Sequence, residues 1–142
     1  MKMNINDDVA KVLVKIGLEE YEIDNVFSRN KYLTTLIDDD VLDVVKYLYT
    51  NCKMDMPDIK KLILKNPFVL NESFSRINAL ESIYKTVGIE NEKYKVLINN
   101  FDKALSINPQ NLADSINVLQ KQGYDNEKIA DLIIENPYLV IK

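Results

Sequence analysis

The chain has 142 residues, of which 46% are hydrophobic and 28% are charged, and its formal net charge is −4. This length suits one domain that buries a hydrophobic core, and no apolar run approaches the roughly 18 residues that a membrane-spanning helix needs. The acidic balance repels phosphate at long range, so nucleic-acid binding would require a local basic patch.

The N-terminal segment MKMNINDDVAKV resembles no targeting sequence. It lacks the hydrophobic stretch of a secretory signal and the arginines of a mitochondrial transit peptide. Cys52 is the only cysteine, so no internal disulfide is expected. From these features we predict a cytoplasmic protein.

Two landmarks recur along the chain with a period of 35 or 36 residues. The first landmark is a glycine or a cysteine, at Gly17, Cys52, Gly88 and Gly123. The second landmark is an asparagine or a phenylalanine, at Asn30, Asn66, Phe101 and Asn136. A period this constant is typical of a repeat protein, so the interpretation of every other motif depends on it.

Apolar residues recur at fixed distances from both landmarks. Five residues before the first landmark are Val12, Tyr47, Ile83 and Val118, and four before it are Leu13, Leu48, Tyr84 and Leu119. Four residues before the second landmark are Val26, Leu62, Leu97 and Leu132, and three beyond it are Leu33, Val69, Ala104 and Leu139. This spacing predicts helices that each bury one face, with Leu97 and Leu132 pointing inward.

Each repeat is therefore predicted to contain a helix, a turn, a second helix and a short apolar segment. In chain order, helices are expected near 8–16, 19–29, 40–51, 57–65, 73–87, 91–100, 109–122 and 126–135. The repeats themselves are repeat 1 (6–39), repeat 2 (40–71), repeat 3 (72–107) and repeat 4 (108–142). One repeat cannot bury its apolar face alone, so we predict a single all-α domain over 1–142, a helical-repeat solenoid without a β-sheet.

Glycine and proline mark the ends of the predicted helices. Glycine at the first landmark suits a helix that ends in a left-handed residue. Asn66 and Asn136 precede Pro67 and Pro137, and a residue before proline is disfavoured in a helix, so the second helices should end there. The prolines then open a short turn, which could be a 3₁₀ helix.

These features together resemble the repeat of the mitochondrial transcription termination factor (mTERF) family. The similarity is greatest in KKLILKNPFVLNESFSRINALESIYKTVGIENEKYKVLI, residues 60–98, and it returns in LADSINVLQKQGYDNEKIADLIIENPYLVIK, residues 112–142. The resemblance implies helical repeats in a curved superhelix. For many members of the family it also implies nucleic-acid binding through a basic groove.

No residue pattern predicts catalysis, a cofactor, a metal ion or a small-molecule substrate. The chain has no histidine, and its three glycines are too scattered for a phosphate-binding loop. Cys52 is interpreted as a small packing residue at a helix end. Asp38, Asp39 and Asp40 could hold a divalent cation, but acidic residues at a helix start are more simply explained by the helix dipole, as are Asp7 and Asp8.

Two groups of residues are candidates for binding. Tyr32, Phe68 and Tyr138 share one position in the repeat and could line a surface, although such a column is more often core. The best nucleic-acid candidates are lysines of the middle repeats, at Lys60, Lys61, Lys65, Lys93 and Lys95. Lys60 and Lys95 share a position, so they could lie side by side on adjacent repeats, but solvated lysines on a polar helix face are the simpler interpretation.

We therefore expect a non-catalytic binding module that recognises a macromolecule, a protein in the first place, through its curved surface. The alternative is an mTERF-like regulator that binds DNA or RNA with the lysines of the middle repeats. A contiguous basic groove would favour nucleic acid, whereas an acidic or apolar groove would favour protein.

Overall fold

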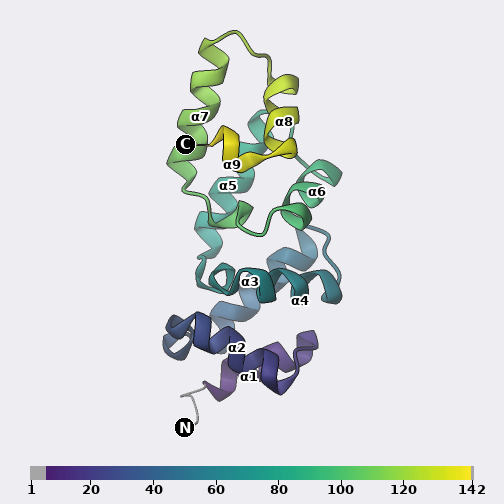
Figure 1. Ribbon diagram of the computed structural model, residues 1–142, viewed down its shortest axis with the longest axis vertical. Helices are drawn as coiled ribbons and strands as arrows, with labels where there is room; N and C mark the ends of the chain where they lie inside the picture. The colour runs from purple at the N-terminus through teal and green to yellow at the C-terminus, as the bar shows by residue number, and fades with distance from the viewer. Residues whose placement is uncertain (1–5, 142) are drawn as a thin grey trace. The chain divides into compact units, whose positions relative to one another are not determined.

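The computed structural model describes residues 6–141, and within that range it is helical and contains no β-strand. The helices are α1 (Asp7–Ile16), α2 (Glu20–Arg29), α3 (Asp38–Thr50), α4 (Met56–Lys65), α5 (Phe74–Thr86), α6 (Glu92–Asn100), α7 (Pro109–Lys121), α8 (Asn126–Glu135) and the short α9 (Pro137–Val140). Three 3₁₀ turns complete the order: η1 (Lys31–Thr35), η2 (Pro67–Asn71) and η3 (Ala104–Ser106). The predicted all-α repeat fold is confirmed, and each of the eight long helices lies within two residues of its predicted bounds (Figure 1).

The chain divides into two compact units, each containing two of the predicted repeats. The N-terminal unit is Met1–Phe74 and the C-terminal unit is Ser75–Lys142. The boundary falls at the start of α5, so repeats 1 and 2 lie in the first unit and repeats 3 and 4 lie in the second.

The predicted helix ends are confirmed, with one displacement. Gly17 ends α1 with a φ of 109°, a left-handed conformation that glycine adopts without a steric penalty, and the other two glycines also have positive φ. Repeat 2 has Cys52 at this landmark, and there the positive φ moves one residue on, to Lys53 with 55°. Asn66 and Asn136 end α4 and α8 outside the helical region, with φ of −136° and −164°, as expected of residues before proline.

In the N-terminal unit, helices of repeat 2 pack on helices of repeat 1. Helix α3 packs against α1, α4 packs against α1 and α2, and η2 packs against α3, α4 and η1. A buried asparagine joins the two repeats, because the Asn30 side chain donates to the carbonyl oxygen of Pro67 at 3.0 Å and exchanges hydrogen bonds with Asn71. The residue at the second landmark of repeat 1 therefore ends α2 and also links repeat 1 to repeat 2.

In the C-terminal unit, aromatic residues carry the contacts between repeats. Figure 1 shows α7 and α8 running antiparallel, with α9 folded back against α8. The Tyr138 ring packs edge-on against Phe101 at 5.5 Å, and its hydroxyl oxygen accepts the Lys103 backbone N–H at 2.9 Å. Phe101 replaces the expected asparagine of repeat 3, and this contact gives the replacement a structural role.

Tyr84 is a polar residue in the core of the second unit. It is fully buried, its ring lies 5.9 Å from that of Tyr94, and its hydroxyl donates to the carbonyl oxygen of Ala104 at 3.1 Å. Burial raises the pKa of the Tyr84 hydroxyl well above its usual range, because the charged phenolate would lose its hydration. Tyr84 is therefore a neutral donor that ties α5 to η3.

Candidate functional site

Three of the predicted lysines lie on α4 in the N-terminal unit. The helix starts after Asp55, whose side chain accepts the Asp58 backbone N–H at 2.9 Å, and Pro57 occupies its first turn. The side chains of Lys60, Lys61 and Lys65 line one shallow hollow of about 310 Å³ together with Pro57 and Leu64.

Lys60 does not point freely into solvent, contrary to expectation. Its side chain is 33% exposed and its ammonium group lies 3.2 Å from the carboxylate of Glu22 on α2. Glu22 also accepts the Glu19 backbone N–H at 3.0 Å. That hydrogen bond, followed by the Lys60 charge, lowers the pKa of Glu22. The predicted exposure of Lys60 was wrong because it was based on the position of Lys60 along α4 alone. The position along one helix does not show that the preceding repeat places the Glu22 carboxylate beside this lysine.

Lys93 and Lys95 lie on α6 in the C-terminal unit. Lys93 is exposed and Lys95 is half-buried, so Lys95 also points less fully into solvent than expected. Lys60 and Lys95 belong to different compact units, and their alignment stays a prediction.

The aromatic column is exposed, so its interpretation as core was wrong. Tyr32, Phe68 and Tyr138 are 56%, 51% and 43% exposed, whereas the residues that follow Tyr32 and Phe68, Leu33 and Val69, are fully buried. Successive side chains diverge by about 120° in a 3₁₀ turn, which has three residues per turn, so Phe68 can face outward while Val69 and Leu70 face the core.

Basic side chains accompany two of these aromatic residues. Turns η1 and η2 pack together, and α2 and α4 end beside them. Arg29 donates to the carbonyl oxygens of Leu64 and Lys65 at 2.5 and 3.1 Å, which places its guanidinium group at the end of α4. We call this surface the aromatic edge, and its members are Arg29, Lys31, Tyr32, Lys65 and Phe68.

The remaining candidates have structural roles. Asp38, Asp39 and Asp40 form the first turn of α3, where the Asp40 carboxylate accepts the Ile37 backbone N–H at 3.3 Å. Within residues 6–141, no group of three histidine, cysteine or acidic side chains is arranged to hold a metal ion. Cys52 is completely buried at the end of α3, as a packing residue would be.

Asp7 and Asp8 lie in the first turn of α1, as expected, but the cap is the preceding Asn6. Its side-chain oxygen accepts hydrogen bonds from the backbone N–H groups of Asp8 and Val9.

No helix within residues 6–141 is long and apolar enough to cross a membrane.

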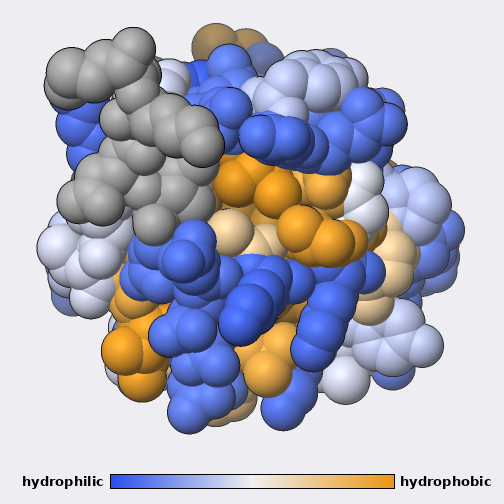
Figure 2. All heavy atoms as spheres, turned by 90° about the horizontal axis from the view of Figure 1, so that it is seen from below, coloured by the Kyte–Doolittle hydropathy of each residue, from blue (hydrophilic) through white to orange (hydrophobic). Residues whose placement is uncertain are grey.

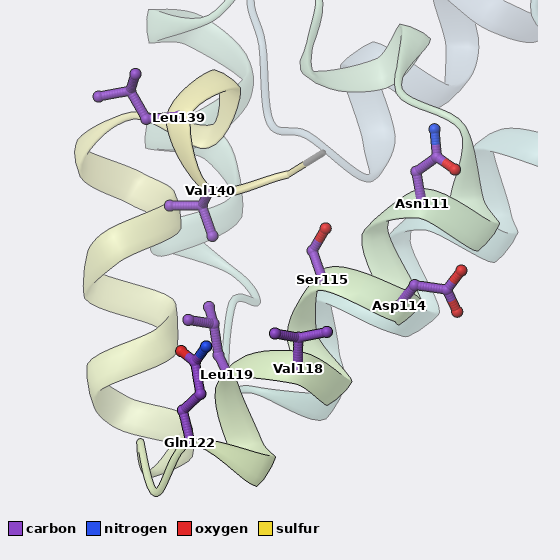
Figure 3. A pocket seen from close by; sticks show the side chains of 8 residues that line it. All are labelled: Asn111, Asp114, Ser115, Val118, Leu119, Gln122, Leu139 and Val140. Carbon is purple, nitrogen blue, oxygen red and sulfur yellow. The ribbon is translucent and has the colours of Figure 1, made fainter.

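An apolar groove between α7 and α9 was missed by the sequence analysis. The groove, about 430 Å³ in volume, is lined by Asn111, Asp114, Ser115, Val118, Leu119, Gln122, Leu139 and Val140 (Figure 3). Val118 is 52% exposed and Leu139 is 70% exposed, so neither is part of the core as predicted. We call this feature the C-terminal groove.

The same two columns are less exposed in the preceding repeats. The counterparts of Leu139 are fully buried, at Leu33, Val69 and Ala104. Of the three counterparts of Val118, Val12 and Tyr47 are 8% and 2% exposed, and Ile83 is half-buried. Helical periodicity indicated which residues share a face, but a face is buried only where another helix covers it.

Comparison with protein families supports the resemblance noted above. The sequence matches the mTERF family over residues 1–142. A search of curated proteins returned no match.

Proposed function

The chain belongs to the mTERF family, and on that premise we propose that it is a non-catalytic binding module whose partner is a protein held in the C-terminal groove. The observation that carries this proposal is the exposure of Leu139, at 70%, in a column whose other members are completely buried. Exposed apolar side chains that gather in one groove mark interaction surfaces, whereas single exposed apolar residues are ordinary.

The contacts of the inner repeats indicate what kind of protein fits. In the N-terminal unit, a helix of the next repeat covers the column: α3 packs against α1, and Phe74 at the start of α5 packs edge-on against Tyr47 at 6.1 Å. Tyr47 is the repeat counterpart of Val118. A helix laid across α7 and α9 would likewise cover Val118 and Leu139, and burying each side chain fully is worth about 1.5–3 kcal/mol.

Side chains in the groove offer little chemistry beyond binding. The polar groups that line it are amides, a serine hydroxyl and the carboxylate of Asp114. Asp114 accepts a hydrogen bond from the Gln110 side chain at 2.8 Å, and Ser115 is 8% exposed. The sequence has no histidine that could activate this hydroxyl. A recognition role agrees with these features.

The test is affinity capture from native lysate treated with nuclease. We compare the original chain with Leu139→Asp and with Tyr21→Asp, because Tyr21 on α2 is 69% exposed and lies outside the groove. A protein captured by the original chain and by Tyr21→Asp, but lost with Leu139→Asp, supports the proposal. Equal capture by all three chains contradicts it.

Nucleic-acid binding through the N-terminal unit is the second candidate. Members of the mTERF family typically bind nucleic acids, and the aromatic edge combines exposed rings with basic side chains beside the α4 lysines. Rings that stack on bases, together with cations that contact phosphates, are the usual means of holding a single strand.

Titration with fluorescent single-stranded and duplex DNA and RNA tests this candidate. Contacts from Lys31, Lys61 and Lys65 predict a slope of log affinity against log salt of about −2 on a single strand. Lys61→Glu with Lys65→Glu should abolish such binding, whereas Lys93→Glu should not affect an interaction confined to the N-terminal unit. Binding that survives the double reversal would rule out this surface.

A further inference from the structure

The first helices of repeats 1 and 2 share a sequence pattern on their exposed side as well as in their core. Residues 8–14 of α1 read DVAKVLV, and residues 43–49 of α3 read DVVKYLY at the same positions of the repeat. The buried members agree, as a shared core requires. The exposed members agree too, because both helices have an aspartate, a lysine and an apolar residue at nine, six and three residues before the first landmark.

The apolar member of this exposed pattern belongs to the N-terminal unit. Val14 is 59% exposed and Tyr49 is 56% exposed. The same position is exposed in the C-terminal unit, where it holds Lys85 and Gln120, as a solvated helix surface would. Packing within residues 6–141 therefore does not account for an apolar residue at this position in α1 and α3. Exposed apolar side chains that gather on one surface mark a site of interaction.

Helices α1 and α3 present these residues on one surface. The two helices pack together, and the Asn6 side chain at the start of α1 donates to the carbonyl oxygen of Leu36, just before α3, at 2.6 Å. The helices therefore begin at the same edge of the unit, and residues at the same position of the repeat face the same way. We call this surface the outer face, and its members are Lys11, Val14, Lys15, Lys46 and Tyr49.

Part of the outer face is hollowed. A shallow hollow of about 480 Å³ on α1 is lined by Asp7, Ala10, Lys11, Val14 and Lys15. Figure 2 shows the end of the molecule at which α1 and α2 lie, where hydrophobic side chains gather between hydrophilic ones. An apolar depression with a charged rim can receive an apolar side chain of a partner.

The order of charges along the outer face indicates the kind of partner. In α1, Asp8 precedes Lys11 and Lys15. In α3, Asp43 precedes Lys46. A nucleic-acid strand or an anionic membrane would meet like charge at the aspartates. A protein helix that lies antiparallel to α1 and α3 meets opposite charge at both ends, because helices favour acidic residues in the first turn and basic residues in the last.

We propose that the outer face docks an amphipathic helix of a partner protein, antiparallel to α1 and α3. The apolar stripe of that helix covers Val14 and Tyr49, and its acidic first half lies over the lysines. Opposite charges at the edge of an apolar contact fix its direction more than they strengthen it. The outer face shares no residue with the C-terminal groove, so this contact goes beyond the proposed function and does not depend on it.

Selection from a displayed library of amphipathic helices tests the chemistry of the partner. Each helix has about 14 residues, or four turns, with a fixed apolar stripe and randomised charged positions. The original chain should enrich helices with Asp or Glu in the first half and Lys or Arg in the second. Lys11→Glu with Lys46→Glu should instead enrich Lys or Arg in both halves, because the double variant leaves the aspartates in place.

The affinity of the enriched helix then identifies the surface that binds it. In fluorescence anisotropy, Tyr49→Ser should raise its Kd about tenfold or more, because the apolar contact at this position is lost. Tyr21→Ser is the matched control and should leave the Kd unchanged, since Tyr21 on α2 is 69% exposed and lies outside the outer face. Both tyrosines are exposed, so both variants should keep the helical circular dichroism and melting temperature of the original chain.

No enrichment by the original chain overturns the proposal, as does a Kd that Tyr49→Ser leaves unchanged. If Leu139→Asp abolishes binding of the enriched helix and Tyr49→Ser does not, the helix lies in the C-terminal groove, so the outer-face proposal is wrong and the proposed function stands. Binding to phosphatidylserine vesicles that Tyr49→Ser abolishes would assign the outer face to a membrane and would also overturn the proposal.

Discussion

Repeats 2 and 4 end in nearly the same sequence, KNPFVL and ENPYLV, yet the two endings differ in what they expose. Pro67 and Pro137 are both buried, and the aromatic residue after each is exposed. The two endings differ in the exposure of the next residue, because Val69 is fully buried and Leu139 is 70% exposed. Burial in a helical repeat therefore depends on the neighbouring helix as much as on the repeat itself.

The strongest test of this comparison places the same charge in both endings. Val69→Asp should unfold the N-terminal unit or destabilise it by more than about 4 kcal/mol, because it buries a carboxylate without a partner. Leu139→Asp should change stability by less than about 0.5 kcal/mol, as surface substitutions do. Chemical denaturation of both variants measures the difference, and similar losses would show that Leu139 is buried.

A second pair extends the comparison to the inner helices. Leu97 in repeat 3 is fully buried, whereas Leu132 at the same position of repeat 4 is only half-buried, not fully inward as predicted. Leu97→Ala should cost about 2–5 kcal/mol and Leu132→Ala clearly less, because fewer contacts are lost. Lys93→Ala, an exposed change on α6, is the control and should leave the melting temperature unchanged. Equal losses at the two leucines would contradict the partial exposure of repeat 4.

Much of the fold could be predicted because its signals are local. Glycines and the Asn-Pro steps fix helix ends through backbone conformation, so the eight predicted spans agree with the structure. The exposure of Val118 and Leu139 could not be predicted from periodicity, which does not show whether a helix lies on top. The outward direction of Phe68 depends on the geometry of a 3₁₀ turn, so helical periodicity could not predict it. The ion-pair partner of Lys60 lies in another repeat, so the sequence around Lys60 could not predict it either.

The buried Asn30, which links repeats 1 and 2, allows the hydrogen bonds that hold η2 to be tested one at a time. Asn30→Ala removes its hydrogen bonds to Pro67 and Asn71 and leaves their polar groups partly buried, so we expect a loss of about 1–3 kcal/mol. Asn71→Ala should cost less, because Asn30 keeps its bond to the Pro67 carbonyl oxygen. Thermal unfolding of the two single variants measures this order, and the reverse order would show that Asn30 is not the main link.

The ion pair on α4 gives the smallest expected effect. Lys60 lies six residues before the second landmark of repeat 2, and the same position of repeat 4 is Ala130. The ion pair between Lys60 and Glu22 therefore distinguishes repeat 2 from repeat 4. Because the pKa of Glu22 is lowered in the folded chain, its contribution is present at neutral pH and is lost as pH falls below its ordinary value of 4.5. Glu22→Gln should therefore flatten the fall in melting temperature over that acidic range, and an unchanged fall would contradict the role of this carboxylate.

The most direct measurement is the reactivity of a thiol placed at the same column in the two endings. In dilute native solution, the thiol introduced by Leu139→Cys should react with a maleimide as fast as one introduced by Tyr21→Cys. The thiol introduced by Val69→Cys should react only on unfolding, as should the native Cys52, which is fully buried. Slow reaction at position 139, matching that at position 69, would show that the last repeat is covered and would contradict the binding groove.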